Sequence, residues 1–153
     1  MGYTMRVMNM LRRLGSVLVV GALGAGLLAG CSSSKDSGDP AAAASQASNG
    51  ASLSVDVFAA FVAEPGVHVI DVRTPDEYAT SHLAGAINMD VQGTFATDIA
   101  NLDKDASYAL YCRTGGRSGS AKQMMLSSGF THVVDLSGGI EAWTKAGKPV
   151  AAG

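Results

Sequence analysis

Short apolar segments alternate with segments of helical spacing from residue 53 onward, and this alternation predicts the secondary structure. The apolar segments predict strands over residues 67–72, 86–89, 108–112 and 131–136, and the first of them is rich in β-branched residues. The segments between and around them predict helices over residues 55–62, 75–81, 95–102, 118–128 and 139–143. Strands that alternate with helices favour an α/β fold, a small parallel sheet with helices on both faces.

Turn and capping residues mark where these elements begin and end. Ser54 is a good N-cap for the first helix, and Pro65-Gly66 ends it. Thr74 is a candidate N-cap for the next helix, with Pro75 in its first turn and Glu77 completing a capping box. We therefore expect short helices with well-defined starts.

The first 30 residues differ in composition from the rest of the chain. They contain 18 residues of the apolar set, three arginines and no acidic residue, and residues 14–30 carry no charge. This uncharged stretch is shorter than the ~20 residues that cross a bilayer comfortably, and glycines interrupt it. A basic start, a short apolar stretch and a small-residue end are typical of a secretory signal peptide, which we place at residues 1–30.

The end of this segment, Leu-Leu-Ala-Gly-Cys at residues 27–31, resembles the lipobox of bacterial lipoproteins. The resemblance implies that the signal is cleaved before Cys31, that the Cys31 thiol is lipidated and that the new amino terminus is acylated. The protein would then be extracytoplasmic and lipid-anchored to a bacterial membrane, at the periplasmic face or the cell surface. An uncleaved membrane anchor and a buried apolar helix are the alternatives.

Residues 32–52 contain no aromatic and no β-branched residue, and we interpret residues 31–52 as a lipidated cysteine followed by a flexible linker. Residues 53–153 form the expected folded domain. All 13 acidic residues but only eight of the 11 basic ones lie after residue 30, so the net charge of this part is −5. An acidic body argues against nucleic acid as a partner.

A glycine-rich loop with two arginines follows the strand predicted at residues 108–112. It begins at Cys112, whose thiol would lie at the carboxyl end of a parallel strand, where ligands bind in such sheets. The backbone N–H groups of the loop and the start of the next helix favour an anion. Arg113 and Arg117 add positive charge, so we expect a reactive Cys112 thiolate.

Three blocks of sequence carry a resemblance to the single-domain rhodaneses, a family of thiosulfate sulfurtransferase-like modules. The blocks are Ile70 to Asn88, the loop Cys-Arg-Thr-Gly-Gly-Arg-Ser at 112–118, and Ser-Gly-Gly-Ile-Glu-Ala-Trp at 137–143. The resemblance implies a rhodanese-like fold in which Cys112 carries a sulfane sulfur as a persulfide. It implies that the loop binds the substrate through Arg113, Thr114, Gly115, Gly116, Arg117 and Ser118.

Two comparisons with related patterns sharpen this interpretation. Ser81 stands where the family pattern usually has glycine before His82, and we expect no loss of activity from it. Related phosphatases have five residues between the loop cysteine and arginine, whereas four separate Cys112 from Arg117. The smaller ring suits a sulfur atom and crowds a phosphate, which makes phosphoester hydrolysis the weaker alternative.

Other residues near the expected site favour structural roles. Asp71 and Arg73 are expected to support the site through an ion-pair and capping network, and His82 to pack within a turn. Trp143 is expected to anchor the last helix to the core, and the glycines at 138–139 to turn tightly near the cysteine loop. The histidines are too dispersed for a metal site, and we expect no metal and no cofactor.

The sequence thus predicts a sulfurtransferase that takes sulfur from a small sulfur-containing anion and gives it to a thiol or cyanide. The alternative is a persulfide carrier without turnover, or a docking module that serves one dedicated extracytoplasmic protein. Redox sensing by Cys112 is a weaker third hypothesis, since no resolving cysteine is nearby. With Cys31 lipidated and Cys112 free, we expect no disulfide, and we expect a monomer.

Overall fold

The computed structural model describes residues 38–152, which fold around a five-stranded sheet. Its strands are β1 (Ser52–Leu53), β2 (Val67–Asp71), β3 (Ile87–Asn88), β4 (Ser107–Tyr111) and β5 (His132–Leu136). The helices are α1 (Pro40–Ser45), α2 (Val55–Val62), α3 (Pro75–Thr80), α4 (Phe95–Asp98), α5 (Gly116–Ser127) and α6 (Gly139–Lys145), and the 3₁₀ helix η1 (Ile99–Asn101) follows α4. The predicted α/β class is confirmed.

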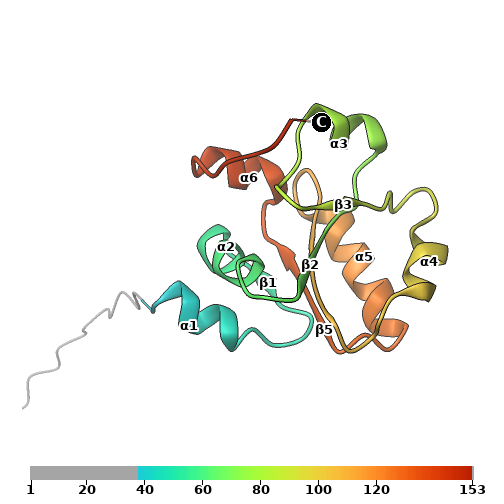
Figure 1. Ribbon diagram of the computed structural model, residues 1–153, viewed down its shortest axis with the longest axis horizontal. Coiled ribbons are helices and arrows are strands. Elements are labelled where there is room, and N and C mark those ends of the chain that lie inside the picture. The colour runs from blue at the N-terminus through green and yellow to red at the C-terminus, as the bar shows by residue number, and fades with distance from the viewer. Residues whose placement is uncertain (1–37, 153) are drawn as a thin grey trace, which may run out of the picture. The chain divides into compact units, whose positions relative to one another are not determined.

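All strand pairs of this sheet are parallel, in the order β1-β5-β4-β2-β3. Helices α1, α2 and α6 lie on one face of the sheet, and α4 and α5 lie on the other (Figure 1). β4 is the central strand, flanked by β5 and β2. The loop that follows β4 therefore lies between the loops of two neighbouring parallel strands, at the edge where ligands bind in such sheets.

Alternate residues of the strands enter two separate hydrophobic cores. Val69 and Ala109 face the core under α2 and α6, whereas Ile70 and Leu110 face the core under α4 and α5. Because both faces are covered, the central strands are apolar at nearly every position. This explains why the sequence shows them as continuous apolar runs.

The predicted starts of the helices agree with the structure, with one shift. Ser54 lies at the N-cap of α2, and Thr74 and Glu77 form the predicted capping box of α3. Helix α5, expected from residue 118, begins two residues earlier at Gly116. The reason is that Gly115 adopts a left-handed conformation with φ of 99°, which lets the helix follow the cysteine loop directly.

The linker predicted for residues 31–52 is wrong for its second half. Asp39 caps α1 and Ala44 is buried, although the segment has no large apolar side chain. Asn49 accepts a hydrogen bond from the N–H of Val133 at 2.8 Å and donates one to the carbonyl of Phe130. Backbone groups at and just before the start of β5 thus hold this segment in place, and the pattern of apolar residues does not reveal such partners.

The C-terminal segment returns across the domain after α6. The Trp143 indole donates a hydrogen bond to the carbonyl of Pro149 at 2.8 Å, and its ring packs edge-on against Phe58. The backbone of Ala151 then pairs with that of His82 in an antiparallel bridge, beside α3 (Figure 1). The predicted anchoring role of Trp143 is confirmed.

The predicted signal peptide at 1–30 and Cys31 lie outside the described residues. Among residues 38–152, no helix has the length and apolar character to cross a membrane.

Candidate active site

Cys112 lies immediately after β4, at the carboxyl end of the central strand, and its side chain is almost fully buried. The loop it begins folds back over the sulfur, since the N–H of Gly115 donates a hydrogen bond to Cys112 Sγ at 3.1 Å. The left-handed conformation of Gly115 permits this curl. The backbone of Gly115 therefore contacts the sulfur directly.

Hydrogen bonds to the sulfur favour its charged form. Burial raises the pKa of the Cys112 thiol, but donors from Ser118, Gly115 and Thr114 outweigh burial and hold that pKa below its ordinary value. The Ser118 contribution comes from both its backbone N–H and its hydroxyl. Ser118 belongs to the first turn of α5, so the positive end of the helix dipole adds to the stabilisation of the thiolate.

Arg117 lies beside the thiol but is held by a carboxylate from another helix. Its two terminal nitrogens each donate to one oxygen of Glu77 at 2.7 Å, and about a quarter of its side chain is exposed. Hydrogen bonding to Arg117 is the largest cause that lowers the pKa of Glu77 to about 2. Glu77 also closes the capping box of α3, so it fixes the helix start and the Arg117 side chain together.

Arg113 forms a second ion pair, on the solvent side of the loop. Its Nε donates to Glu141 of α6 at 2.7 Å, and both side chains are more than half exposed. A cavity of about 300 Å³ lies here between α3, the loop and α6, with Arg73, Glu77, Arg113 and Glu141 among its lining residues. Each loop arginine therefore has a glutamate partner, which the sequence analysis did not identify.

The Gly138-Gly139 turn before α6 packs directly on the backbone of the cysteine loop. The N–H of Ile140 donates to the carbonyl of Cys112 at 2.9 Å. A side chain added at Gly139 would lie 2.5 Å from the carbonyl oxygens of Cys112 and Arg113. The prediction that these glycines turn tightly near the loop is confirmed, and Gly139 is required by close approach as well as by its φ of 60°.

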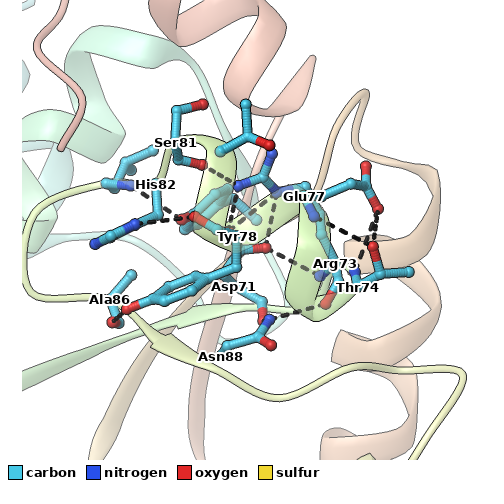
Figure 2. A network of polar contacts seen from close by, with 12 residues as sticks. Asp71, Arg73, Thr74, Glu77, Tyr78, Ser81, His82, Ala86 and Asn88 are labelled. Atoms are coloured by element: carbon cyan, nitrogen blue, oxygen red, sulfur yellow. Dashed lines mark hydrogen bonds and ion pairs between the residues drawn. The ribbon is translucent and has the colours of Figure 1, made fainter. Parts of the chain in front are cut away.

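Asp71 and Arg73 form the expected ion pair, and both side chains are buried. The Arg73 guanidinium donates to both oxygens of Asp71 and to the carbonyl of Ser81 (Figure 2). Asn88 holds the same turn by donating to the backbone carbonyls of Asp71 and Arg73. These contacts fix the turn between β2 and α3, and with it the position of Glu77.

The departure at Ser81 and the environment of His82 are both explained in this turn. Ser81 has an extended backbone with φ of −168°, so this position does not require glycine. The His82 ring stacks on Tyr78 with 4.0 Å between centroids, and its Nδ1 lies 3.1 Å from the carbonyl of Tyr78. Figure 2 shows both residues at the end of α3. The predicted packing of His82 is confirmed.

Two further predicted site residues, Thr114 and Gly116, lie in the cysteine loop and at the start of the helix that follows it. Gly116 is the first residue of α5, and Thr114 is an exposed residue of the loop between Cys112 and Gly115. Within the described part of the chain, no group of three or more histidine, cysteine or acidic residues is placed to hold a metal ion.

The fold and the loop together define a rhodanese-like domain. The family described as Rhodanese-like domain matches residues 54–146, so the chain belongs to this family.

Several curated relatives carry sulfurtransferase names. The chain is 39% identical over 89 residues to thiosulfate sulfurtransferase PspE of Escherichia coli, covering 56% of this chain and 78% of the relative. It is 36% identical over 98 residues to the chloroplastic thiosulfate sulfurtransferase 16 of Arabidopsis thaliana, covering 57% and 82%. These similarities support membership of a sulfurtransferase family.

Solved structures give the same fold. A rhodanese-related protein from Thermoplasma volcanium superposes with a TM-score of 0.59 at 29% identity, covering 67% of this chain and 99% of that one. The rhodanese-like domain of the Anabaena Alr3790 protein superposes with a TM-score of 0.60 at 26% identity, covering 66% and 78%.

Proposed function

We propose that this protein is a sulfurtransferase that moves a sulfane sulfur from thiosulfate, or a similar donor, to a thiol or cyanide through a persulfide on Cys112. The observation that carries the proposal is the environment of the Cys112 sulfur. The sulfur lies at the carboxyl end of the central strand, accepts the Gly115 N–H and has a lowered pKa. The relatives named thiosulfate sulfurtransferases support the choice of donor.

In the first step the Cys112 thiolate attacks the outer sulfur of thiosulfate. The sulfur–sulfur bond of thiosulfate breaks, sulfite leaves with the bonding electron pair, and Cys112 becomes a persulfide anion. The negative charge moves from Sγ to the terminal sulfur, so the charge is conserved and no external oxidant is required. The backbone donors of Thr114, Gly115 and Ser118 and the dipole of α5 stabilise the anion in both states.

In the second step the acceptor attacks the terminal sulfur. The bond between this sulfur and Sγ breaks, the electron pair returns to Cys112, and thiocyanate or a new persulfide leaves. Arg113 is exposed at the cavity between α3 and α6, where it is placed to attract an anionic donor. Arg117 contributes positive charge beside the sulfur while Glu77 holds its position.

Incubation with thiosulfate and cyanide tests the proposal. We expect thiocyanate from the unmodified chain, none from Cys112→Ser, and undiminished turnover from the matched control Cys31→Ser. Phosphatase turnover without thiocyanate would favour the weaker phosphoester alternative and overturn the sulfurtransferase assignment.

The second candidate function is a persulfide carrier for one dedicated extracytoplasmic partner. It is favoured by the burial of Cys112, which restricts access of acceptors to the sulfur. A dedicated carrier loads one sulfur from thiosulfate but releases it slowly to small thiols. Single-turnover mass spectrometry separates the two functions by comparing the rates of loading and release.

The cellular location that we propose for this protein depends on its first 31 residues. We propose that the chain is exported, cleaved before Cys31 and lipidated there, which would anchor the domain to a bacterial membrane outside the cytoplasm. The apolar segment and the Leu-Ala-Gly-Cys ending support this proposal. Intact mass spectrometry of the mature protein should show acylation at Cys31. An unmodified chain that begins at Met1 would overturn the localisation.

A further inference from the structure

A buried ion pair lies behind the cysteine loop and takes no part in the steps above. Lys122 of α5 contacts Asp135 of β5 with 2.7 Å between Nζ and Oδ1, and the two side chains are 6% and 4% exposed. A buried ion pair costs desolvation free energy, and well-packed apolar residues often replace one without loss of stability. Stability alone therefore does not account for its presence.

The two carboxylate oxygens of Asp135 have different partners. Oδ1 accepts hydrogen bonds from Lys122 and from the hydroxyl of Ser52 in β1, at 2.7 and 2.6 Å. Oδ2 lies 3.1 Å from the hydroxyl oxygen of Ser118. Lys122 thus neutralises one end of the carboxylate, and Ser118 contacts the other end.

Ser118 connects this pair to the reactive sulfur. Its hydroxyl lies within hydrogen-bonding distance of Asp135 Oδ2 and of the Gly115 carbonyl, both at 3.1 Å, and the N–H of Gly115 donates to the Cys112 sulfur at 3.1 Å. Hydrogen bonding by Ser118 also lowers the pKa of the Cys112 thiol. A hydroxyl has a single proton, so it donates to one of these acceptors at a time. The carboxylate and the thiolate are the two charged acceptors, and they compete for that proton.

We propose that Lys122 and Asp135 are positioning residues that decide whether the Ser118 hydroxyl donates its proton to the Cys112 sulfur or to the carboxylate. The Lys122 ammonium withdraws electron density from Asp135 and weakens its attraction for the Ser118 proton. The hydroxyl is then free to turn toward the sulfur and stabilise the thiolate. This inference deepens the proposed function of the same site.

The other charged groups near the Cys112 sulfur are unchanged in the Lys122 and Asp135 variants that test this proposal. They are Arg117 of α5 with its partner Glu77 of α3, Arg113 of the loop with Glu141 of α6, and the Asp71–Arg73 pair at the end of β2. Variants at Lys122 and Asp135 leave each of these ion pairs in place. A change in the ionisation of Cys112 is then assigned to the buried pair.

The test is the rate of Cys112 alkylation by iodoacetamide against pH in the full chain. Mass spectrometry of the peptide that contains Cys112 excludes any contribution from Cys31. We expect Lys122→Met to move the midpoint of the profile to higher pH and Asp135→Asn to move it to lower pH. Redirecting one ordinary hydrogen bond changes the thiolate-to-thiol ratio by about threefold to tenfold, which sets the expected size of each shift.

Both substitutions are repeated in a Ser118→Ala background. If Ser118 transmits the effect, Lys122→Met and Asp135→Asn no longer shift the midpoint there. An equal shift with and without the hydroxyl would show that charge acts through space, and would overturn the proposal. The absence of any shift in the native background would overturn it as well.

Folding of the variants is followed by circular dichroism, because Lys122→Met leaves a buried carboxylate without its cation. The double variant Lys122→Met/Asp135→Leu removes both charges and keeps the site apolar. We expect it to fold and to have a midpoint at or below that of the native chain, since no carboxylate competes for Ser118. A midpoint raised as in Lys122→Met would contradict the proposal. Because alkylation requires no sulfur transfer, a failed thiocyanate assay leaves this test interpretable.

Discussion

The backbone nitrogen of Gly115 lies 3.1 Å from the sulfur of Cys112 and donates a hydrogen bond to it. This contact joins the two ends of a tight loop, and it exists because Gly115 adopts a left-handed conformation. The donor is part of the backbone, so it does not depend on the ionisation of any other residue. It is therefore present over the whole pH range in which the domain is folded.

The first prediction concerns the ionisation of this thiol. Because hydrogen bonds outweigh burial and lower the pKa of Cys112, its alkylation rate should fall at a lower pH than the rate of an ordinary cysteine thiol. The midpoint of the rate profile should lie below that of the same thiol in guanidinium-unfolded protein. Equal midpoints in folded and unfolded chains would contradict the expected stabilisation of the thiolate.

The second prediction concerns Gly139. The substitution Gly139→Ala should reduce sulfur transfer strongly, because the new methyl group would lie 2.5 Å from two carbonyl oxygens of the cysteine loop. The clash should also destabilise the fold by about 2 kcal/mol. Gly147→Ala is the matched control, since Gly147 has a similar φ of 71° and open space around it. The control should lose about 1–2 kcal/mol of stability and keep its activity, as thermal melting and the thiocyanate assay can show.

The third prediction concerns Glu77, whose pKa is lowered from 4.5 to about 2. A carboxylate with a lowered pKa stabilises the folded state fully above about pH 4.5 and loses this effect as the pH falls toward 2. Glu77→Gln should therefore melt below the native protein at pH 7, and the difference in Tm should shrink between pH 4.5 and 2. Glu141→Gln, at the exposed ion pair with Arg113, should change the Tm little. A Tm difference for Glu77→Gln that is constant with pH would refute the role of this ion pair.

The fourth prediction concerns the segment before β1. Asn49→Ala should destabilise the domain by about 1–2 kcal/mol, because the Val133 N–H and the Phe130 carbonyl lose their side-chain partner. The exposed Asn101→Ala is the control and should cost less than about 0.5 kcal/mol. Urea unfolding measures both. Equal stabilities of the two variants would indicate that residues 40–50 contribute little to the fold.

Elements with a strong local signal could be predicted from the sequence. The capping box at Thr74 and Glu77 and the apolar strand that ends before Cys112 carry their signals within a few residues. The reactive loop could be predicted for the same reason, since its glycines and arginines are contiguous. The ordered segment at residues 40–50 could not, because its partners are backbone groups about 80 residues away.

The ion pairs of the site depend on how the chain folds in three dimensions. Glu77 lies 40 positions before Arg117, and its role in the capping box gave no indication of a second partner. Lys122 is a charged residue on a helix, and such residues are usually exposed. Its burial follows from the approach of α5 to the Asp135 side of β5, which no pattern of apolar residues reveals.

The pairing of β1 with β5 has a consequence for how the chain is made. Ser52 lies opposite Asp135, so this contact joins residues 83 positions apart. A ribosome that synthesises the chain from its N-terminus completes β5 long after β1, and β1 has no strand partner until then. Contacts between residues so distant in sequence form slowly. Ser52 therefore reaches the Asp135 carboxylate late in folding, and the polar network behind Cys112 is completed only when the sheet closes.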